Sequence, residues 1–435
     1  MILKKISLFL DEALAPTFYN GGLSLVNILP LFYYCIWKDS VNKNTFHDIR
    51  KLFNEKYGLK NTYFVNSGRS ALYLLLISLD RDYRDEIILP SYTCVVIPNA
   101  IRFAGYKVVY CDIEDQTYNI DVNKLSDLIS KKTKAIIHQY TYGIPNNIDF
   151  VKEICNNSNI LFIEDCAHAL GSKYKNMYTG TFGDAAFFSL QKTKMVTTYA
   201  GGILTVNNEN INKYVKKNFN NLTYIDSLKE KKMIYQIINS YFKHHIIIKY
   251  FYKRIKRLVV NNLSSISKKI SYYLIDPLKE EKSAERNGDM SKSYLEILPN
   301  KLLLILKMQI NNLDKDVERR NFYSEEIIQI MSEIGLKIPD YDRKIIYPSW
   351  NRLPFQVKSR ENLILVLNKL QIPYSLWFDN PLYQSNEKTR LLNNYNKELY
   401  PCSKKVSEHI INLTVSRSVN WYYIKKLKKI SDSFN

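Results

Sequence analysis

Short, continuous apolar runs alternate with helix-like segments through the first half of this chain. The runs lie at residues 62–65, 86–89, 107–110, 134–137, 159–163, 185–190 and 202–206. Most of them are separated by segments with apolar positions at helical spacing, such as residues 122–129 and 149–156. Strands buried on both faces have this unbroken apolar character, which is typical of a parallel sheet covered by helices. The pattern therefore predicts an α/β fold, in which ligands bind at the carboxyl ends of the strands.

The pattern changes after about residue 220. Residues 227–276 have helical spacing and are rich in basic and aromatic side chains, whereas residues 279–289 are densely charged and are predicted to be a linker. A basic amphipathic helix can lie on an anionic membrane surface, and it can equally pack its apolar stripe on its own protein. Both interpretations of this insertion, at about residues 222–290, stay open.

The last part of the chain has the pattern of a second, smaller domain. Residues 298–331 have helical spacing, and strand-like runs then alternate with helical segments. The strands are predicted at residues 353–357 and 373–378, and the helices at residues 360–370, 402–411 and 420–431. We therefore divide the chain into a large domain with an N-terminal arm and the insertion, residues 1–330, and a small α+β domain, residues 331–435.

Composition limits the classes of function. The chain has 435 residues, 46% of them hydrophobic, and a net charge of +20. The basic residues follow no nucleic-acid recognition pattern, so this charge favours anionic ligands or a membrane surface over a nucleic-acid partner. The six cysteines have no metal-ligand spacing, which indicates reduced thiols in a cytoplasmic protein without a metal site. The apolar run at residues 23–37 is shorter than the roughly 20 residues of a spanning helix, so no transmembrane segment is predicted.

The strand at residues 185–190 leads into a hydroxyl, Ser189, and then into two lysines, Lys192 and Lys194. Burial lowers the pKa of a lysine amine toward the range in which it is a nucleophile that forms a Schiff base. The alternative is that both lysines are solvated loop residues in a lysine-rich protein.

The strand at residues 159–163 is followed by Asp165 and His168. A carboxylate at the end of a buried strand needs a cationic partner, and a protonated pyridine nitrogen is one. His168 is then close enough in sequence to reach the phenolic oxygen of the same ring. Alternatively, Asp165 caps the next helix and His168 is structural.

A third motif, Ser67-Gly68-Arg69-Ser70, lies between a predicted strand and the start of a predicted helix. Backbone amides and the helix dipole favour a phosphate at such a position, and a glycine permits close approach. Ser189 would add a hydroxyl to that phosphate. The three motifs complement one another as a phosphate cradle, a partner for a pyridinium nitrogen and a reactive lysine.

In order and spacing these motifs resemble the DegT/DnrJ/EryC1/StrS family of sugar aminotransferases, which use pyridoxal phosphate and have fold type I. The resemblance covers residues 62–206 and is carried by the following stretches: SGRSAL at 67–72, LPSYT at 89–93, DQTYNID at 115–121, TKAII at 133–137, YGIP at 142–145, IEDCAHA at 163–169, GTFGD at 180–184 and FSLQKTK at 188–194.

The resemblance implies a large, mostly parallel seven-stranded sheet and a set of cofactor-binding residues. Lys194 would be the catalytic Schiff-base lysine, Asp165 the partner of the pyridine nitrogen and His168 the partner of the ring oxygen. The phosphate would be held by Arg69, Ser70 and Ser189, and Gly68 would be a further cofactor-binding residue. The resemblance further implies a homodimer with its active sites at the subunit interface. The reaction would be amino transfer from glutamate to a nucleotide-linked keto-sugar, in the synthesis of a bacterial polysaccharide such as O-antigen or of a secondary metabolite.

The sequence departs from the family at several positions. Cys94 stands where an aromatic side chain commonly stacks on the cofactor ring, and Tyr92 could substitute for it. Trp377 and Phe378 replace a His-Tyr pair at a loop that faces the substrate, and residues 295–298 lack the Asn-x-Arg-Met stretch that reaches the neighbouring subunit. Two alternatives therefore stay open: a dehydratase of the same fold, in which histidine replaces the lysine, and a non-catalytic protein that binds the cofactor or contacts the inner face of the membrane.

Overall fold

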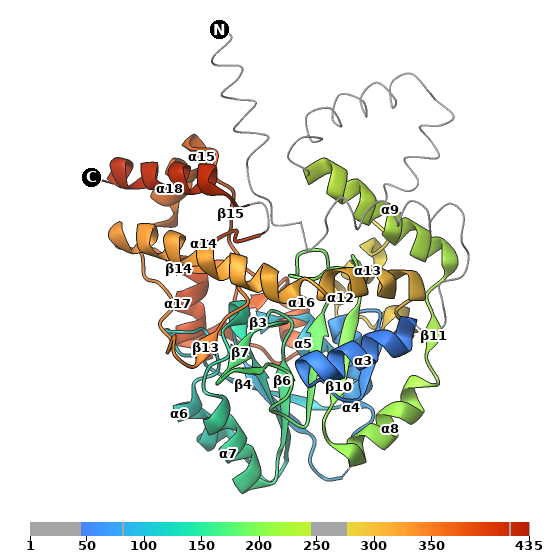
Figure 1. Cartoon of the computed structure of the whole chain (residues 1–435). Helices are drawn as coiled ribbons and strands as arrows, with labels where there is room; N and C mark the ends of the chain where they lie inside the picture. Colours follow the sequence, from blue (N-terminus) through green and yellow to red (C-terminus); the bar gives the residue numbers. More distant parts are fainter. Residues whose placement is uncertain (1–44, 81, 245–275, 417–418, 435) are drawn as a thin grey trace.

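The computed structural model of the chain describes residues 45–80, 82–244, 276–416 and 419–434 (Figure 1). The N-terminal arm with its apolar run at residues 23–37, and the basic centre of the insertion at residues 245–275, lie outside these ranges. Within them, none of the helices combines the length and the apolar character that a bilayer crossing requires.

A central sheet organises the described part of the chain. Its main strands lie in the order β1-β10-β9-β6-β5-β2-β4, and the short strands β12 and β11 extend the sheet beyond β1. Strands β4, β2, β5, β6 and β9 pair in parallel, whereas β10 is antiparallel to both β9 and β1. The bounds are β1 (Thr62–Val65), β2 (Glu86–Pro90), β4 (Lys107–Cys111), β5 (Thr133–Gln139), β6 (Leu161–Asp165), β9 (Ala185–Ser189), β10 (Gly202–Val206), β11 (Thr223–Tyr224) and β12 (Glu296–Ile297). All seven predicted apolar runs are strands of this sheet.

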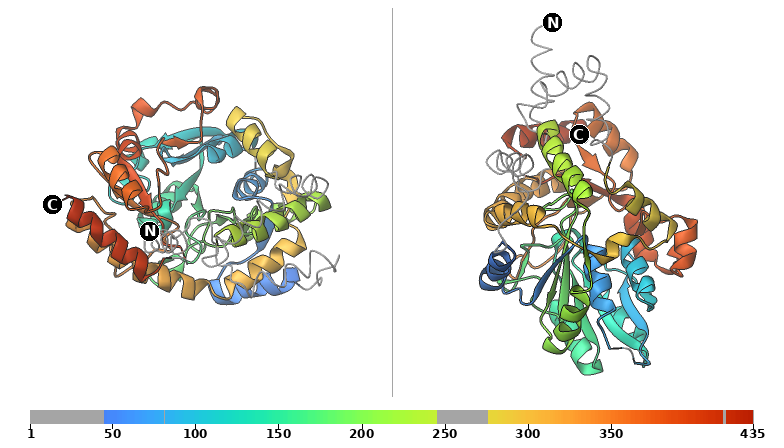
Figure 2. Two further views of the ribbon diagram at one scale, coloured as in Figure 1. Left: turned by 90° about the horizontal axis from the view of Figure 1, so that it is seen from above. Right: turned by 90° about the vertical axis from the view of Figure 1, so that its right-hand side faces the viewer.

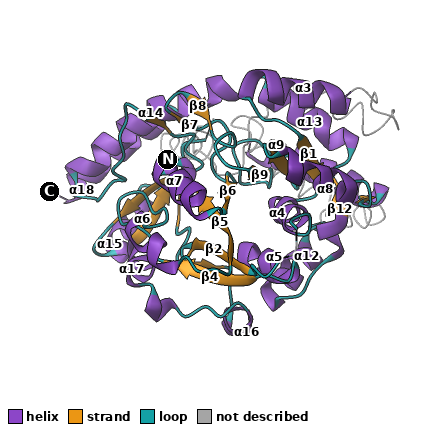
Figure 3. Ribbon diagram, turned by 90° about the horizontal axis from the view of Figure 1, so that it is seen from below, coloured by secondary structure: helices purple, strands orange, loops and turns teal. Residues whose placement is uncertain are grey.

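Helices cover both faces of the sheet, which explains the unbroken apolar runs (Figure 3). Ile88, Ile136 and Phe162 belong to a core shared with α3, α7, α13 and α14. Side chains one position away along the strands, such as Ile87 and Ile137, belong to a separate core with α4, α5 and α8. The bounds are α3 (Thr45–Tyr57), α4 (Gly68–Leu76), α5 (Val96–Phe103), α7 (Ile148–Ser158), α8 (Glu209–Phe219), α13 (Asn300–Ile310) and α14 (Leu313–Glu333).

A smaller antiparallel sheet lies near the C-terminus, in the order β14-β17-β15. Its elements are β14 (Leu353–Gln356), α15 (Arg360–Lys369), β15 (Tyr374–Ser375), α17 (Pro401–His409), β17 (Ile410–Leu413) and α18 (Trp421–Phe434), and α18 lies alongside α14 (Figure 2). The predicted division of the chain at residue 330 falls within α14 and stays a prediction.

Two predictions for this region are wrong in detail. The strand predicted at residues 373–378 is confined to β15, because the Trp377 amide donates to Oδ1 of Asn412 instead of to a strand partner and the chain turns into a loop. The helix predicted at residues 402–411 ends at His409, since the apolar residues after it form the middle strand of the small sheet.

The predicted linker at residues 279–289 is also wrong, because most of it forms the helix α12 (Lys279–Asn287). Glu281 and Glu285 of this helix are buried, and both form ion pairs with Arg69 at the start of α4. The local sequence has no apolar stripe, so nothing near residue 280 indicates that one face of this helix is covered. The rest of the insertion that the structure describes includes α9 (Ser227–His244).

One further strand pair joins the C-terminal region to the central sheet. Strand β3 (Thr93–Cys94), just beyond β2, pairs in parallel with β16 (Leu382–Tyr383). This pairing brings an aromatic loop from the C-terminal region to the carboxyl ends of the central strands.

Candidate active site

A cavity of about 310 Å³ lies at the carboxyl ends of β5, β6 and β9. This is where an α/β sheet of this kind binds its ligands. Its wall includes nine of the eleven predicted site residues: Gly68, Arg69, Cys94, Asp165, His168, Ser189, Lys194, Trp377 and Phe378. The other two, Ser70 and Tyr92, are buried behind the wall.

Lys194 and Asp165 influence each other across this cavity. Lys194 keeps some contact with solvent through the cavity, and burial lowers the pKa of its amine to about 8, although the charge of Asp165 opposes that change. Burial likewise raises the pKa of Asp165. A hydrogen bond from the Ala167 amide (2.9 Å) and the charge of Lys194 act in the opposite direction and lower this pKa. A lysine amine of lowered pKa that shares a cavity with a buried carboxylate is typical of a catalytic site, in which the amine is the candidate nucleophile.

His168 is buried and neutral. Burial, and then the charges of Lys194 and Arg352, hold the pKa of its imidazole well below the ordinary value. Its Nδ1 accepts a hydrogen bond from the Tyr142 amide (3.3 Å), so the single proton of the neutral ring lies on Nε2. His168 therefore offers a hydrogen-bond donor at Nε2.

The start of α4 forms one side of the cavity. Ser67 caps this helix, because its Oγ accepts a hydrogen bond from the Ser70 amide (3.2 Å). A Cβ added at Gly68 would lie 3.2 Å from the Cβ of Ser189, and one at Gly202 would lie only 2.1 Å from the Ser67 carbonyl oxygen. The two glycines thus let the start of α4 lie directly on the end of β9 and the beginning of β10.

Arg69 and Ser70, which the sequence places at a phosphate, have protein partners. Nη2 of Arg69 donates to Oε2 of Glu281 at 2.8 Å, and its Nε lies 2.9 Å from Oε1 of Glu285. The hydroxyl of Ser70 donates to the Ser293 carbonyl oxygen at 2.9 Å. The glutamates lie far from the cradle in sequence, so the pattern around residue 69 could not reveal them.

Cys94, and not Tyr92, lines the cavity. The hydroxyl of Tyr92 lies 2.9 Å from that of Tyr142 and 3.1 Å from the carbonyl oxygen of Phe378, which anchors the ring behind the cavity wall. Burial raises the pKa of the Cys94 thiol to about 11, so the thiol is neutral. The small side chain leaves room beside Lys194.

Trp377 comes from the C-terminal loop and lies over the reactive groups. The centroid of its ring is 5.1 Å from Nζ of Lys194 and 4.4 Å from Cζ of Arg352. The ring of His168 lies 4.5 Å away from that of Trp377. Arg352, which also donates to the Ser375 hydroxyl, is a cavity residue that the sequence analysis missed, since it carries no local motif and only the fold brings it to Lys194.

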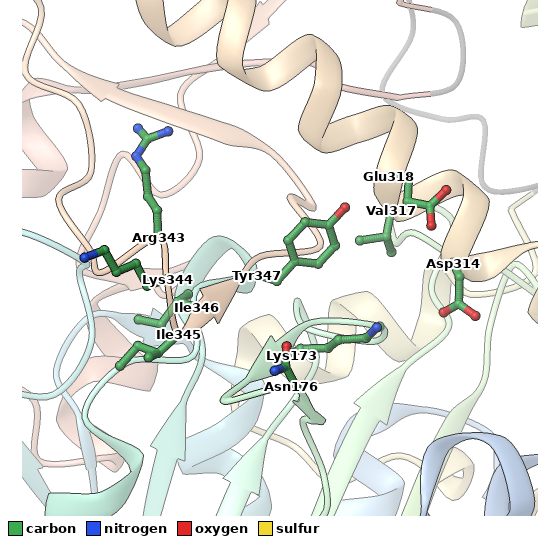
Figure 4. Close-up of a pocket in the computed structure, with 11 residues that line it drawn as sticks. Lys173, Asn176, Asp314, Val317, Glu318, Arg343, Lys344, Ile345, Ile346 and Tyr347 are labelled. Atoms are coloured by element: carbon green, nitrogen blue, oxygen red, sulfur yellow. The ribbon is translucent and has the colours of Figure 1, made fainter.

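A second cavity, of about 340 Å³, lies between α14 and the strands β7 (Lys173–Tyr174) and β13 (Ile346–Tyr347) (Figure 4). Its wall mixes cations such as Arg343 with the carboxylates of Asp314 and Glu318, and it contains none of the predicted site residues. Among the described residues, no group of three His, Cys, Asp or Glu side chains is arranged to hold a metal ion.

Residues 41–236 match the family model described as the DegT/DnrJ/EryC1/StrS aminotransferase family. The match covers somewhat less than half of the chain. The chain is 36% identical over 159 residues to a GDP-perosamine synthase of Escherichia coli O157:H7, an alignment that covers 37% of this chain and 44% of that protein. It is also 34% identical over 140 residues to a dTDP-4-dehydro-2,3,6-trideoxy-D-glucose 4-aminotransferase of Saccharopolyspora spinosa, which is 32% of this chain and 36% of that protein. These alignments span less than half the length of either relative.

Solved structures of DegT-family aminotransferases share the fold of nearly the whole chain. Helicobacter pylori PseC, an aminotransferase involved in the biosynthesis of pseudoaminic acid, has a TM-score of 0.72 at 18% identity and covers 97% of this chain and 99% of its own. A Streptococcus pneumoniae protein solved in its PLP form has a TM-score of 0.68 at 17% identity and covers 97% and 100%. The fold is therefore that of fold type I, as the resemblance implies.

Pyridoxal phosphate is the cofactor of this family, and the cavity fits it. The start of α4, where Gly68 and Ser189 line the cavity, is a helix N-terminus of the kind that binds anions. A buried carboxylate, a neutral imidazole with a free N–H and an amine of lowered pKa match a pyridinium nitrogen, a ring oxygen and an aldehyde.

Proposed function

We propose that this protein is a PLP-dependent aminotransferase that transfers an amino group from glutamate to a nucleotide-linked keto-sugar, in the synthesis of a bacterial polysaccharide or a secondary metabolite. The observation that carries the proposal is the placement of Lys194 and Asp165 in one cavity, with the pKa of each shifted by burial. The names of two relatives, a GDP-perosamine synthase and a dTDP-sugar 4-aminotransferase, support a nucleotide sugar as the acceptor.

Each group in the cavity has a role in this proposal. When bound, pyridoxal phosphate supplies an aldehyde for the amine and a ring that withdraws electrons. Lys194 holds the cofactor and, once its amine is free, takes up and returns the proton of the substrate carbon that carries nitrogen. Asp165 keeps the ring nitrogen protonated, and His168 donates from Nε2 to the ring oxygen. Ser189 and the amides at the start of α4 hold the phosphate.

The surroundings of Lys194 favour its proposed role as nucleophile and proton acceptor. Since burial lowers the pKa of its amine to about 8, a useful fraction of the amine is unprotonated near neutral pH and can both attack and accept a proton. Trp377 covers the amine and keeps water from one side of it. A homodimer in the cytoplasm remains part of the proposal. The dehydratase alternative is disfavoured because lysine, and not histidine, stands at position 194.

The proposal is tested by trapping the cofactor on the protein. Borohydride treatment of the yellow wild type should attach a pyridoxyl group to the peptide that contains Lys194, and the variant Lys194→Ala should lose both the label and the absorption band. Lys192→Ala is the matched control, because Lys192 lines the same cavity two residues earlier and should leave the labelling of Lys194 intact. Transfer of nitrogen from ¹⁵N-glutamate to a panel of nucleotide-linked keto-sugars then tests the reaction. A wild type labelled elsewhere, or not at all, would contradict the assignment.

A further inference from the structure

One face of α12 lines the same cavity as Lys194. The residues that take part are Glu281, Lys282, Glu285 and Arg286, together with Leu278 just before the helix. Their spacing places them on a single stripe along the helix. The stripe belongs to the end of the insertion, a segment to which the sequence analysis assigned no role in the site.

The inner row of this stripe is acidic, and its charge is neutralised within the protein. Glu281 is 7% exposed and Glu285 is 3% exposed. Oε2 of Glu281 accepts from Arg69 at 2.8 Å, and its Oε1 lies 2.6 Å from Nζ of Lys229. Oε1 of Glu285 lies 2.9 Å from Nε of Arg69, and its Oε2 accepts from Nδ2 of Asn99 at 2.9 Å. These contacts fix α12 on the start of α4 and leave the two glutamates little power to repel an anion.

The outer row of the stripe is basic and more exposed. Nζ of Lys282 lies 2.5 Å from Oδ2 of Asp276, so part of its charge is already compensated. Arg286, one helical turn further, has an exposed side chain. An arginine presents a planar set of donors that matches phosphate oxygens in pairs.

We propose that Lys282 and Arg286 form a subsite for the diphosphate group of a nucleotide-linked substrate. This inference rests on the proposed function. There, the keto carbon of the nucleotide-linked sugar must reach Lys194 inside the cavity. The diphosphate of the same substrate then lies further out, toward the exposed row of α12. The start of α4 serves the cofactor phosphate in that proposal, which leaves the outer row of α12 for a second anion. The subsite belongs to the same chain as Lys194.

The test measures the affinity of the holoenzyme for GDP and dTDP by calorimetry. Arg286→Gln should weaken binding about tenfold, because one charge-assisted contact to phosphate is lost. Arg286→Lys should recover part of that loss, since the charge remains but the paired geometry does not. The matched control is Arg343→Gln, which removes the same charge from the second cavity (Figure 4) and should leave the affinity unchanged.

The outcomes separate the subsite from the reaction. If Arg286→Gln binds GDP and dTDP as wild type does, if wild type binds neither, or if the variant loses cofactor affinity instead, the subsite proposal is overturned. A salt titration adds a second readout, because the affinity of wild type should fall more steeply with ionic strength than that of Arg286→Gln. A protein that binds GDP through Arg286 but carries no label on Lys194 would retain the subsite and lose the proposed reaction.

Discussion

Arg69 offers the sharpest test of how the site is built, because sequence and structure give it different partners. The sequence places it at the cofactor phosphate, whereas the structure surrounds it with Glu281 and Glu285. The side chains of these three residues are 12%, 10% and 4% exposed, so the cluster is almost removed from water. Arg69→Met keeps an apolar side chain about as long as the aliphatic part of arginine and removes the guanidinium, with its charge and its N–H donors.

The expected loss of stability is large. Removing one partner of a buried ion pair costs about 3–5 kcal/mol, because the remaining charge is left uncompensated. Here Lys229 still faces Glu281, so we expect a value near the lower limit, about 3 kcal/mol. Double substitution of the glutamates by glutamine in the Arg69→Met background should restore most of it, since no buried charge then lacks a partner.

The loss should also depend on pH. Burial already raises the pKa of Glu285, and the charge of Arg69 opposes that rise, so Arg69→Met raises the pKa further. The folded variant then holds a proton that the unfolded chain releases, and its stability falls as pH rises above the ordinary pKa of a glutamate. The deficit relative to wild type should therefore be larger at about pH 8 than at about pH 5.

Urea denaturation of the cofactor-free protein at both pH values measures this loss, and titration with pyridoxal phosphate measures cofactor affinity. We expect Arg69→Met to unfold at lower urea and to bind the cofactor with an affinity that recovers in the triple variant. A variant as stable as wild type that has lost cofactor affinity would refute the reasoning, and it would restore Arg69 to the phosphate.

Three further substitutions test the cavity. Gly202→Ala should abolish cofactor binding, because its Cβ would lie 2.1 Å from the Ser67 carbonyl oxygen and push the start of α4 away. An absorbance titration measures this binding, and an affinity equal to that of wild type would contradict the proposed phosphate cradle. Arg352→Gln should raise the pKa of Lys194 above about 8, since the charge of Arg352 lowers it, and the pH profile of cofactor attachment should move to higher pH. Asp165→Asn should move the pH profile of cofactor attachment to lower pH, because it removes the charge that raises the pKa of Lys194. If the profiles of Arg352→Gln and Asp165→Asn shift in the same direction, the proposed electrostatics are excluded.

The sequence predicted the strands that are buried on both faces. A strand covered on both faces needs apolar residues at every position, so the runs that became β2, β5 and β6 were visible without any knowledge of their partners. Asp165 ends one strand of that kind and Lys194 follows another, and parallel strands bring their carboxyl ends to one edge. The cavity that contains both could therefore be predicted from their positions along the chain.

Arg352 and α12 could not be predicted in this way. Arg352 reaches the cavity because the fold of the C-terminal region brings its guanidinium to Trp377, whose ring centroid lies 4.4 Å from Cζ of Arg352. The face of α12 is buried by ion pairs, and a charged stripe has the same sequence pattern whether a partner or water covers it. Its partner Arg69 lies 212 residues earlier, so no local window contains both members of the pair.

The partners of Arg69 change how the anions of the site are divided. A cation beside a helix start is available to a phosphate only when no carboxylate reaches it first, and here two carboxylates do. In the proposed function, the cofactor phosphate is then left to the amides of α4 and to Ser189, which would bind it without a full positive charge. The same ion pairs hold α12 so that Arg286 lies on its exposed row. One arginine thus helps to position a second one, which in our proposal meets the substrate and not the cofactor.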